Sequence, residues 1–240
     1  MSDPSRTLSR RDLLKIGAAG AMTIAPAFGS EATASTAGAI DTAAQSIGAA
    51  AGEPLQALTA VEADLLEAIV ARLIPTDENG PGATEARAAR YIDRALAGAL
   101  ASFRDVYRTG LAALDRYARA THGAAFTALS PADQDAALMA MEADAAATVA
   151  GGFPGSPGQF FALLRGHTLQ GTFGDPFYGG NANFVGWDLI GYPGVRTFVS
   201  ADEQRMGITL QPNHRSAYDG NMFNRAQASA AHEQDRRHGE

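Results

Sequence analysis

The stretch TAVEADLLEAIVARLIP, residues 59–75, carries the pattern that decides the fold. Thr59 and Glu62 have the spacing of a capping box, in which two side chains satisfy backbone amides at the start of a helix. Pro75 cannot continue a helical hydrogen-bond ladder. Between these signals, large apolar residues recur at helical spacing and would share one face, which predicts an amphipathic helix. They are Val61, Leu65, Leu66, Ile69, Val70, Leu73 and Ile74.

Similar patterns predict further helices toward the C-terminus. Ser130 and Pro131 supply an N-cap and a first-turn proline for one of them, and the Ser200 to Glu203 spacing starts a short last helix through about Met206. Nothing alternates with a period of two, so no strand is expected. The prediction is an all-α fold: an irregular bundle of about five helices, a glycine- and aromatic-rich ordered loop region, and a short C-terminal helix. The helices after the first are expected at 84–100, 103–122, 130–149 and 160–171.

The composition shifts along the chain predict where the folded part lies. Residues 29–54 are rich in Ala, Ser, Thr and Gly and have almost no large apolar side chains, which predicts a flexible linker. The helical domain is expected over 55–212. Residues 213–240 are polar and are predicted to be a tail that frays.

Composition also excludes several classes of function. The chain has no cysteine, so it can hold no disulfide, thiolate metal site or covalently attached c-type haem. The net charge is -7 and Lys15 is the only lysine, which disfavours a nucleic-acid partner. The sequence contains no dinucleotide-binding fingerprint, P-loop, zinc-protease motif or nucleophile elbow. We therefore expect no cofactor, no metal and no catalytic residues in this chain.

The first 28 residues resemble an export signal. Arg10 and Arg11 form a basic pair, and the uncharged run over 16–28 is too short to span a bilayer. This order predicts a twin-arginine signal for a periplasmic protein, whose association with a membrane would come only through partners. A basic amphipathic stretch is the alternative. Two small-residue cleavage sites, at 25–27 and 32–34, are both compatible with the sequence.

The segment 171–198 differs from the rest, because it holds seven glycines and seven aromatic residues with no helical or strand period. Glycine frees the backbone from regular geometry, whereas the rings favour burial, so an ordered irregular loop is expected. Tyr178, Trp187 and Tyr192 have two possible roles here: they either cap the helical core or remain exposed as anchors for a protein partner.

Three other groups could carry chemistry, and each also has a purely structural interpretation. His167 lies on the inward side of its predicted helix, as either a hydrogen-bonded core histidine or a ligand. Residues 77–79 form either a turn or a set of oxygen donors for a hard cation. Residues 179–181 form either a tight turn or an anion cradle. His214, in the predicted tail, is expected to be solvated.

Several motifs together resemble subunit 3, the small subunit, of gluconate 2-dehydrogenase over about residues 55–210. The more specific part is Asp175-Pro176-x-Tyr178-Gly179-Gly180-Asn181 followed by Gly186-Trp187-x-Leu189-Ile190-Gly191-Tyr192-Pro193-Gly194. The weaker matches are Leu58-Thr59 through Asp77, Gly80-Pro81-Gly82-Ala83 and Tyr91-Ile92-Asp93.

The resemblance implies a periplasmic complex at the inner membrane. In such complexes a large subunit containing FAD oxidises a sugar, sugar acid or polyol, and a cytochrome c subunit with haem c passes the electrons toward quinone. The small subunit has no assigned active site. The resemblance implies that it helps the large subunit mature and carries it through the twin-arginine translocase.

The leading hypothesis is a non-catalytic small subunit that binds a folded flavoprotein through the glycine- and aromatic-rich segment. Two alternatives stay open: a small metal-dependent enzyme using His167 with Asp175 or with the residues 77–79, and a free-standing binding module. The residues predicted to form the partner interface are Phe173, Asp175, Phe177, Tyr178, Gly179, Gly180, Asn181, Trp187, Tyr192 and Pro193.

Overall fold

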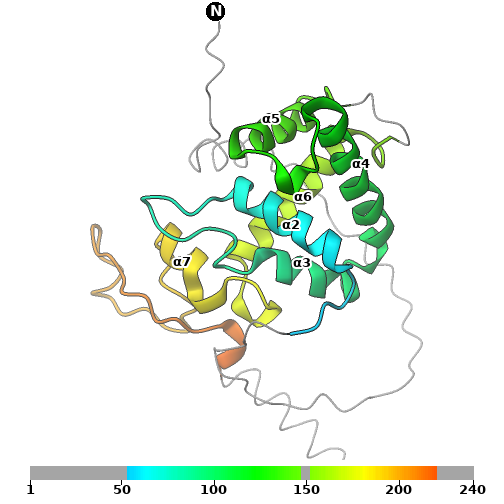
Figure 1. Cartoon of the computed structure of the whole chain (residues 1–240). Coiled ribbons are helices and arrows are strands. Elements are labelled where there is room, and N and C mark those ends of the chain that lie inside the picture. The colour runs from blue at the N-terminus through cyan, green and yellow to red at the C-terminus, as the bar shows by residue number, and fades with distance from the viewer. Residues whose placement is uncertain (1–52, 147–151, 221–240) are drawn as a thin grey trace, which may run out of the picture. The chain divides into compact units, whose positions relative to one another are not determined.

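Six α-helices make up most of the regular structure in a computed structural model that describes residues 53–146 and 152–220 (Figure 1). Among those residues there is no strand and a single isolated bridge, between Asp77 and Gly80. The all-α prediction is therefore confirmed. The predicted export signal, and the linker up to residue 52, lie outside the described residues. The helices are α2 (Ala60–Leu73), α3 (Ala88–Ala97), α4 (Arg104–His122), α5 (Pro131–Glu142), α6 (Pro157–Phe173) and α7 (Val185–Ile190).

Helix α2 begins with the predicted capping box. The Thr59 Oγ1 accepts the amide of Glu62 at 3.3 Å, and the Glu62 Oε2 accepts the amide of Thr59 at 2.8 Å. The apolar stripe from Leu65 through Ile74 is buried, as its spacing predicted. Val61, in the first turn, is the exception: 77% of its surface is exposed, and it lines a pocket together with Leu111 of α4.

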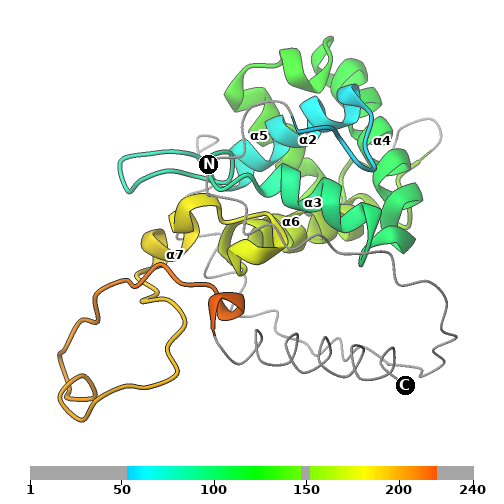
Figure 2. The same cartoon turned by 90° about the horizontal axis from the view of Figure 1, so that it is seen from below.

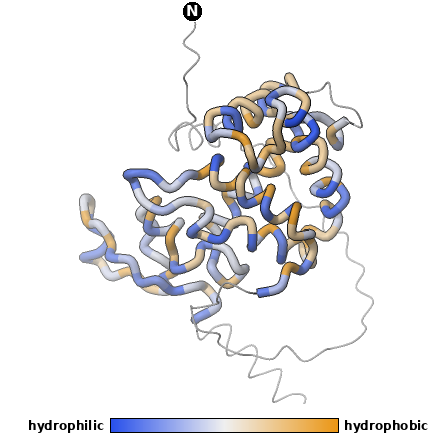
Figure 3. The backbone as a smooth tube through the Cα atoms, viewed as in Figure 1, coloured by the Kyte–Doolittle hydropathy of each residue, from blue (hydrophilic) through white to orange (hydrophobic). Residues whose placement is uncertain are grey.

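Helix α6 lies at the centre of the packing, because it contacts α2, α3, α4, α5 and α7. Phe160, Phe161 and Leu164 are buried on it. Two threonine hydroxyls on the same helix, those of Thr168 and Thr172, donate to the carbonyls four residues back at 2.8 Å, so they are buried with their hydrogen bonds made. Figure 3 shows the apolar residues concentrated on the helices, and the connection between α2 and α3 is mostly polar.

Several predicted boundaries are wrong by a few residues. Helix α3 begins at Ala88 rather than at 84, because Arg87 before it has a left-handed backbone (φ 58°). Helix α5 ends at Glu142 rather than at 149, and Asp144 (φ 59°) turns the chain away. Helix α6 starts earlier than predicted, at Pro157, with the Ser156 hydroxyl as its N-cap.

The predicted short helix over 200–206 is a turn. The Ser200 and Glu203 side chains do make the capping-box hydrogen bonds, at 2.8 and 3.3 Å. The backbone after them has turn geometry, and Met206 is fully exposed. A cap supplies only the first bonds of a helix, and without an apolar face to bury, the helix does not continue.

Gly110 on α4 offers a direct test of how tightly α4 and α6 pack. A Cβ at Gly110 would lie 2.4 Å from the Phe160 Cζ. We expect Gly110→Ala to destabilise the protein by about 1 to 3 kcal/mol through overpacking, even though alanine favours a helix by about 1 kcal/mol. Gly166 on α6 is the matched control, because a Cβ there meets nothing within 4 Å. Gly166→Ala should leave urea unfolding unchanged or shift it upward. Equal behaviour of the two variants would contradict this packing.

Candidate partner interface

The turn after α6 is fixed by Asn181, which is fully buried. Its backbone N–H donates to the Gly171 carbonyl at 2.7 Å, and its side-chain Nδ2 donates to the Gly174 carbonyl at 2.8 Å. Its Oδ1 accepts the amide of Gly186 at 2.8 Å. One side chain therefore closes the C-terminal end of α6 and positions the start of α7. A Cβ at Gly180 would lie 2.1 Å from the Gly171 carbonyl oxygen, so the backbone requires glycine there. The backbone amides of Gly179 and Asn181 donate within the chain, to the Pro176 and Gly171 carbonyls at 2.9 and 2.7 Å, which favours the turn interpretation of residues 179–181.

Trp187 on α7 is buried in the domain, with 5% of its surface exposed. Its Nε1 donates to the Phe173 carbonyl at 2.9 Å. Its ring packs against Phe184 and Tyr192, with centroid distances of 5.4 and 4.8 Å. Of the two roles left open by the sequence, the structure supports the core role for Trp187.

Asp175 binds a segment distant in sequence. Its Oδ1 accepts from the amide of Phe177 at 3.0 Å and from the Ser216 hydroxyl at 2.6 Å, and its Oδ2 accepts from the amide of Ala217 at 2.9 Å. The segment 213–220, predicted to fray with the tail, is therefore held against the turn after α6. The tail prediction is wrong for these residues, because the hydrogen bonds from Ser216 and Ala217 to Asp175 hold them, and no local pattern indicates such a contact.

The rings beside Asp175 complete this attachment. Phe177 stacks on Tyr218 with a centroid distance of 3.7 Å, and the Tyr178 and Tyr218 hydroxyls are 2.6 Å apart. That hydrogen bond, more than burial, raises the pKa of Tyr218. We call Asp175, Phe177, Tyr178, Ser216 and Tyr218 the C-terminal clasp. Phe177 and Tyr178 remain about half exposed within it.

His214 is exposed, as predicted, but it also makes contacts that the sequence did not indicate. Its ring stacks on Phe184 with a centroid distance of 5.0 Å, and its Nε2 lies 2.7 Å from the Asp188 Oδ1. His214 is therefore partly exposed but paired, and it links the C-terminal segment to α7.

His167 is the core histidine that one interpretation predicted. Its Nδ1 shares a 2.8 Å hydrogen bond with the Tyr107 hydroxyl, and the two rings are parallel. Burial lowers the pKa of His167, which favours the neutral ring, and burial also raises the pKa of Tyr107. The residues in 53–146 and 152–220 form no group of three or more His, Asp or Glu side chains that could hold a metal. The hypothesis of a metal site at His167 therefore gains no support from the geometry.

The residues 77–79 form a turn. The Asp77 Oδ1 accepts both the amide and the Nδ2 of Asn79, at 2.8 and 3.1 Å. Backbone hydrogen bonds join Asp77 and Gly80 in both directions, at 3.0 and 3.1 Å. The carboxylate is thus part of the turn itself, as the structural interpretation expected.

Asp93 on α3 is a buried carboxylate whose role the sequence did not reveal. It is 1% exposed, and it accepts the backbone amides of Gln56, Ala57 and Leu58 at 2.9 to 3.0 Å. The Arg90 Nη1 donates to the same carboxylate at 3.0 Å. Asp93 therefore fixes the point at which the N-terminal part of the chain enters the helical domain. One sequence signal for its burial was available: Asp93 follows Ile92 on the apolar face of the helix predicted over 84–100.

The sequence pattern described as gluconate 2-dehydrogenase subunit 3 matches residues 60–194. The chain belongs to the gluconate 2-dehydrogenase subunit 3 family. The match runs from α2 to just beyond α7, so it includes Asp93, Asn181 and Trp187. No curated protein and no solved structure matches the chain. Family membership makes this chain a type of subunit that assembles with a dehydrogenase.

In this subunit 3 family chain, burial separates the predicted interface residues into two groups. Gly180, Asn181 and Trp187 are buried by their own chain, so their role is to build the surface rather than to contact a partner. The residues with exposed rings are Phe177, Tyr178 and Tyr192. Phe173, Asp175, Gly179 and Pro193 are half-buried.

Within 53–146 and 152–220, none of the helices has the length and apolar character needed to cross a bilayer. Arg10 and Arg11 of the predicted export signal lie outside the described residues.

Proposed function

We propose that this chain is a non-catalytic small subunit of a periplasmic flavoprotein dehydrogenase complex that oxidises a sugar, sugar acid or polyol. Membership of the subunit 3 family is the observation that carries this proposal. The FAD belongs to the large subunit and the haem c to a cytochrome c subunit. This chain assists maturation of the large subunit and supplies the export signal at Arg10 and Arg11 for both.

The exposed rings support a role in binding a folded partner. Phe177 and Tyr178, on the hydrogen-bonded turn after α6, and Tyr192, just after α7, keep between 39 and 55% of their surface exposed. Rigid aromatic side chains with one free face are typical of protein interfaces, because they add contact area at little cost in conformational entropy. The Asp175 carboxylate and the side-chain amide of Asn181 fix the turn that presents Phe177 and Tyr178.

The export part of the proposal is tested by changing Arg10 and Arg11 to lysine. The variant and the flavoprotein large subunit are expressed together, and dehydrogenase activity and bound flavin are measured in the periplasmic fraction. We expect both to fall to background, because the twin-arginine pathway reads the arginine pair. Arg6→Lys is the matched control, since Arg6 lies in the same leader outside the pair, and it should export normally.

Two outcomes would count against the proposal in different ways. Full periplasmic activity with the lysine pair would remove the export role. An active large subunit in the periplasm of cells lacking this chain would remove the maturation role as well.

A further inference from the structure

Residues 194–215 form a long arm that leaves the domain after α7 and returns to it beside the C-terminal clasp (Figure 2). Three hydrogen bonds close its root: from the Asn213 amide to the Pro193 carbonyl at 3.1 Å, from the Asn213 Nδ2 to the Val195 carbonyl at 2.8 Å, and from the Val195 amide to the Arg215 carbonyl at 3.3 Å. The arm has no helix or strand. Loops of this length without regular structure are uncommon in compact domains and are usually either functional or linker segments.

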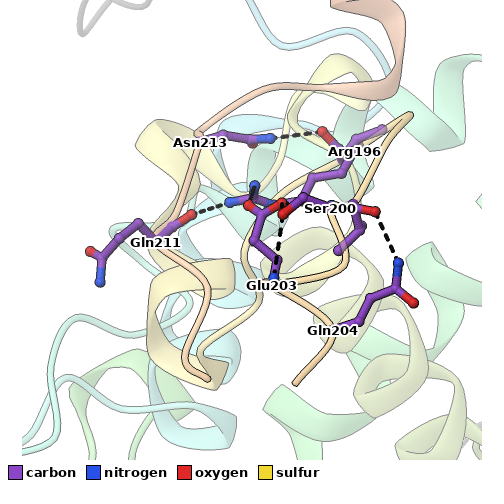
Figure 4. Close-up of polar contacts among 8 residues, drawn as sticks. Arg196, Ser200, Glu203, Gln204, Gln211 and Asn213 are labelled. Atoms are coloured by element: carbon purple, nitrogen blue, oxygen red, sulfur yellow. Dashed lines mark hydrogen bonds and ion pairs between the residues drawn. The ribbon is translucent and has the colours of Figure 1, made fainter. Parts of the chain in front are cut away.

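Polar contacts hold the two sides of the arm together (Figure 4). The Arg196 guanidinium pairs with Glu203 at 3.3 Å and also donates to the Gln211 carbonyl. The Glu203 carboxylate accepts in turn from the Ser200 amide and hydroxyl at 2.8 Å. The Gln204 Nε2 donates to the Val199 carbonyl at 3.0 Å. Arg196 therefore cross-links the two sides of the arm, and only 20% of its side chain is exposed.

The large apolar side chains of the arm have the opposite environment. Phe198 is 77% exposed, Met206 is fully exposed and Ile208 is 52% exposed. Ile190 and Tyr192, just before the root, are also exposed. Three large apolar side chains exposed on one 22-residue loop, with two more just before its root, are apolar surface that a partner could bury.

The composition of the arm favours a protein partner over a lipid surface. Arg196, Arg205 and Arg215 face two carboxylates, Asp202 and Glu203, which leaves one net positive charge and not the cluster of basic residues that anionic lipids attract. Two of the three cations are also paired with those carboxylates, Arg196 with Glu203 and Arg205 with Asp202. Aromatic, methionine and arginine side chains together are the residues enriched at protein interfaces.

We propose that residues 194–215 dock into an apolar groove on the FAD-containing large subunit, with Phe198, Met206 and Ile208 as the anchoring side chains. This inference rests on the proposed function. The arm continues directly from Tyr192, within the surface already assigned to that partner. It also begins where the match to the family ends, at residue 194. An element outside the shared pattern is where one family member can differ from another, so the arm selects this chain's own large subunit.

The test uses the full chain with Phe198→Ser, Met206→Ser and Ile208→Ser combined, expressed together with the flavoprotein large subunit. The small subunit is captured by affinity, and flavin recovered per small subunit is measured. We expect recovery to fall roughly tenfold or more, because buried anchors dominate interface energetics. Val61→Ser is the matched control, since Val61 is as exposed as Phe198 but lies on α2. Both variants should melt at the wild-type temperature, because the changed side chains are solvent-exposed.

The outcomes separate this inference from the proposed function. If the wild-type chain recovers no flavoprotein, the proposed function fails. If the wild type recovers it and the triple variant recovers as much, the arm proposal alone fails. A wild-type chain that sediments as a dimer, or floats with vesicles of phosphatidylcholine and phosphatidylglycerol, in either case only with the arm intact, would assign the arm to a second copy or to a lipid surface and overturn the proposal.

Discussion

Replacing Asp93 with alanine is expected to lower the free energy of unfolding by about 3 to 5 kcal/mol, because it breaks a buried ion pair from one side. The Arg90 guanidinium loses its 3.0 Å contact with the Asp93 carboxylate in a site where only 16% of the arginine side chain is exposed. The amides of residues 56–58 lose their acceptor as well. Denaturation of the full chain in urea, followed by circular dichroism, measures the change.

Asp105→Ala is the matched control for this prediction. Asp105 pairs with Arg108 at the same i,i+3 spacing and the same 3.0 Å distance as Arg90 and Asp93, but both side chains are solvent-exposed. We expect it to cost less than about 1 kcal/mol, as solvent-exposed pairs do. Limited proteolysis supplies a second readout, because loss of Asp93 should admit cleavage ahead of α2. If both variants unfold alike, the proposed role of Asp93 is wrong.

Replacing Trp187 with alanine is expected to lower the free energy of unfolding by about 3 to 5 kcal/mol, as large-to-small changes in a core do. The change leaves a cavity between Phe184 and Tyr192 and frees the Phe173 carbonyl that the indole N–H now satisfies. Thermal and urea unfolding of the full chain measure the effect.

Phe198→Ala is the control for Trp187, because it also removes an aromatic ring but from an exposed position. It should leave the unfolding free energy within about 0.5 kcal/mol of wild type. The opposite pattern would reverse the assignment: if Trp187→Ala melted like wild type while recovering less flavoprotein, Trp187 would be an interface anchor after all.

The sequence predicted those parts of the fold that depend on local signals. The Thr59 to Glu62 capping box and the apolar spacing after it specify α2 without knowledge of the rest of the chain. The Ser-Pro pair at 130–131 did the same for α5, and the identical pair at 156–157 could have set the start of α6. Helix ends were less predictable, because left-handed residues such as Arg87 and Asp144 carry no strong sequence signal.

The candidate interface depends on contacts between distant residues, so the sequence located it only in part. Spacing placed the glycines and rings in one ordered segment but did not distinguish buried Trp187 from exposed Tyr178. That difference comes from the Phe173 carbonyl, which satisfies the indole, and from Tyr218, which pairs with the phenol. The clasp joins residues 41 positions apart through Asp175 and Ser216, and no local pattern predicts such a contact.

The site of the Asp93 hydrogen bonds has a mechanical consequence under the proposed function. A translocase that pulls on the leader applies its load at the start of the domain, where residues 56–58 are tied to α3. The pulling force would therefore be transmitted through Asp93 to α3 before it could unwind α2 from its first turn. A domain attached in this way can be transported through a channel without unfolding.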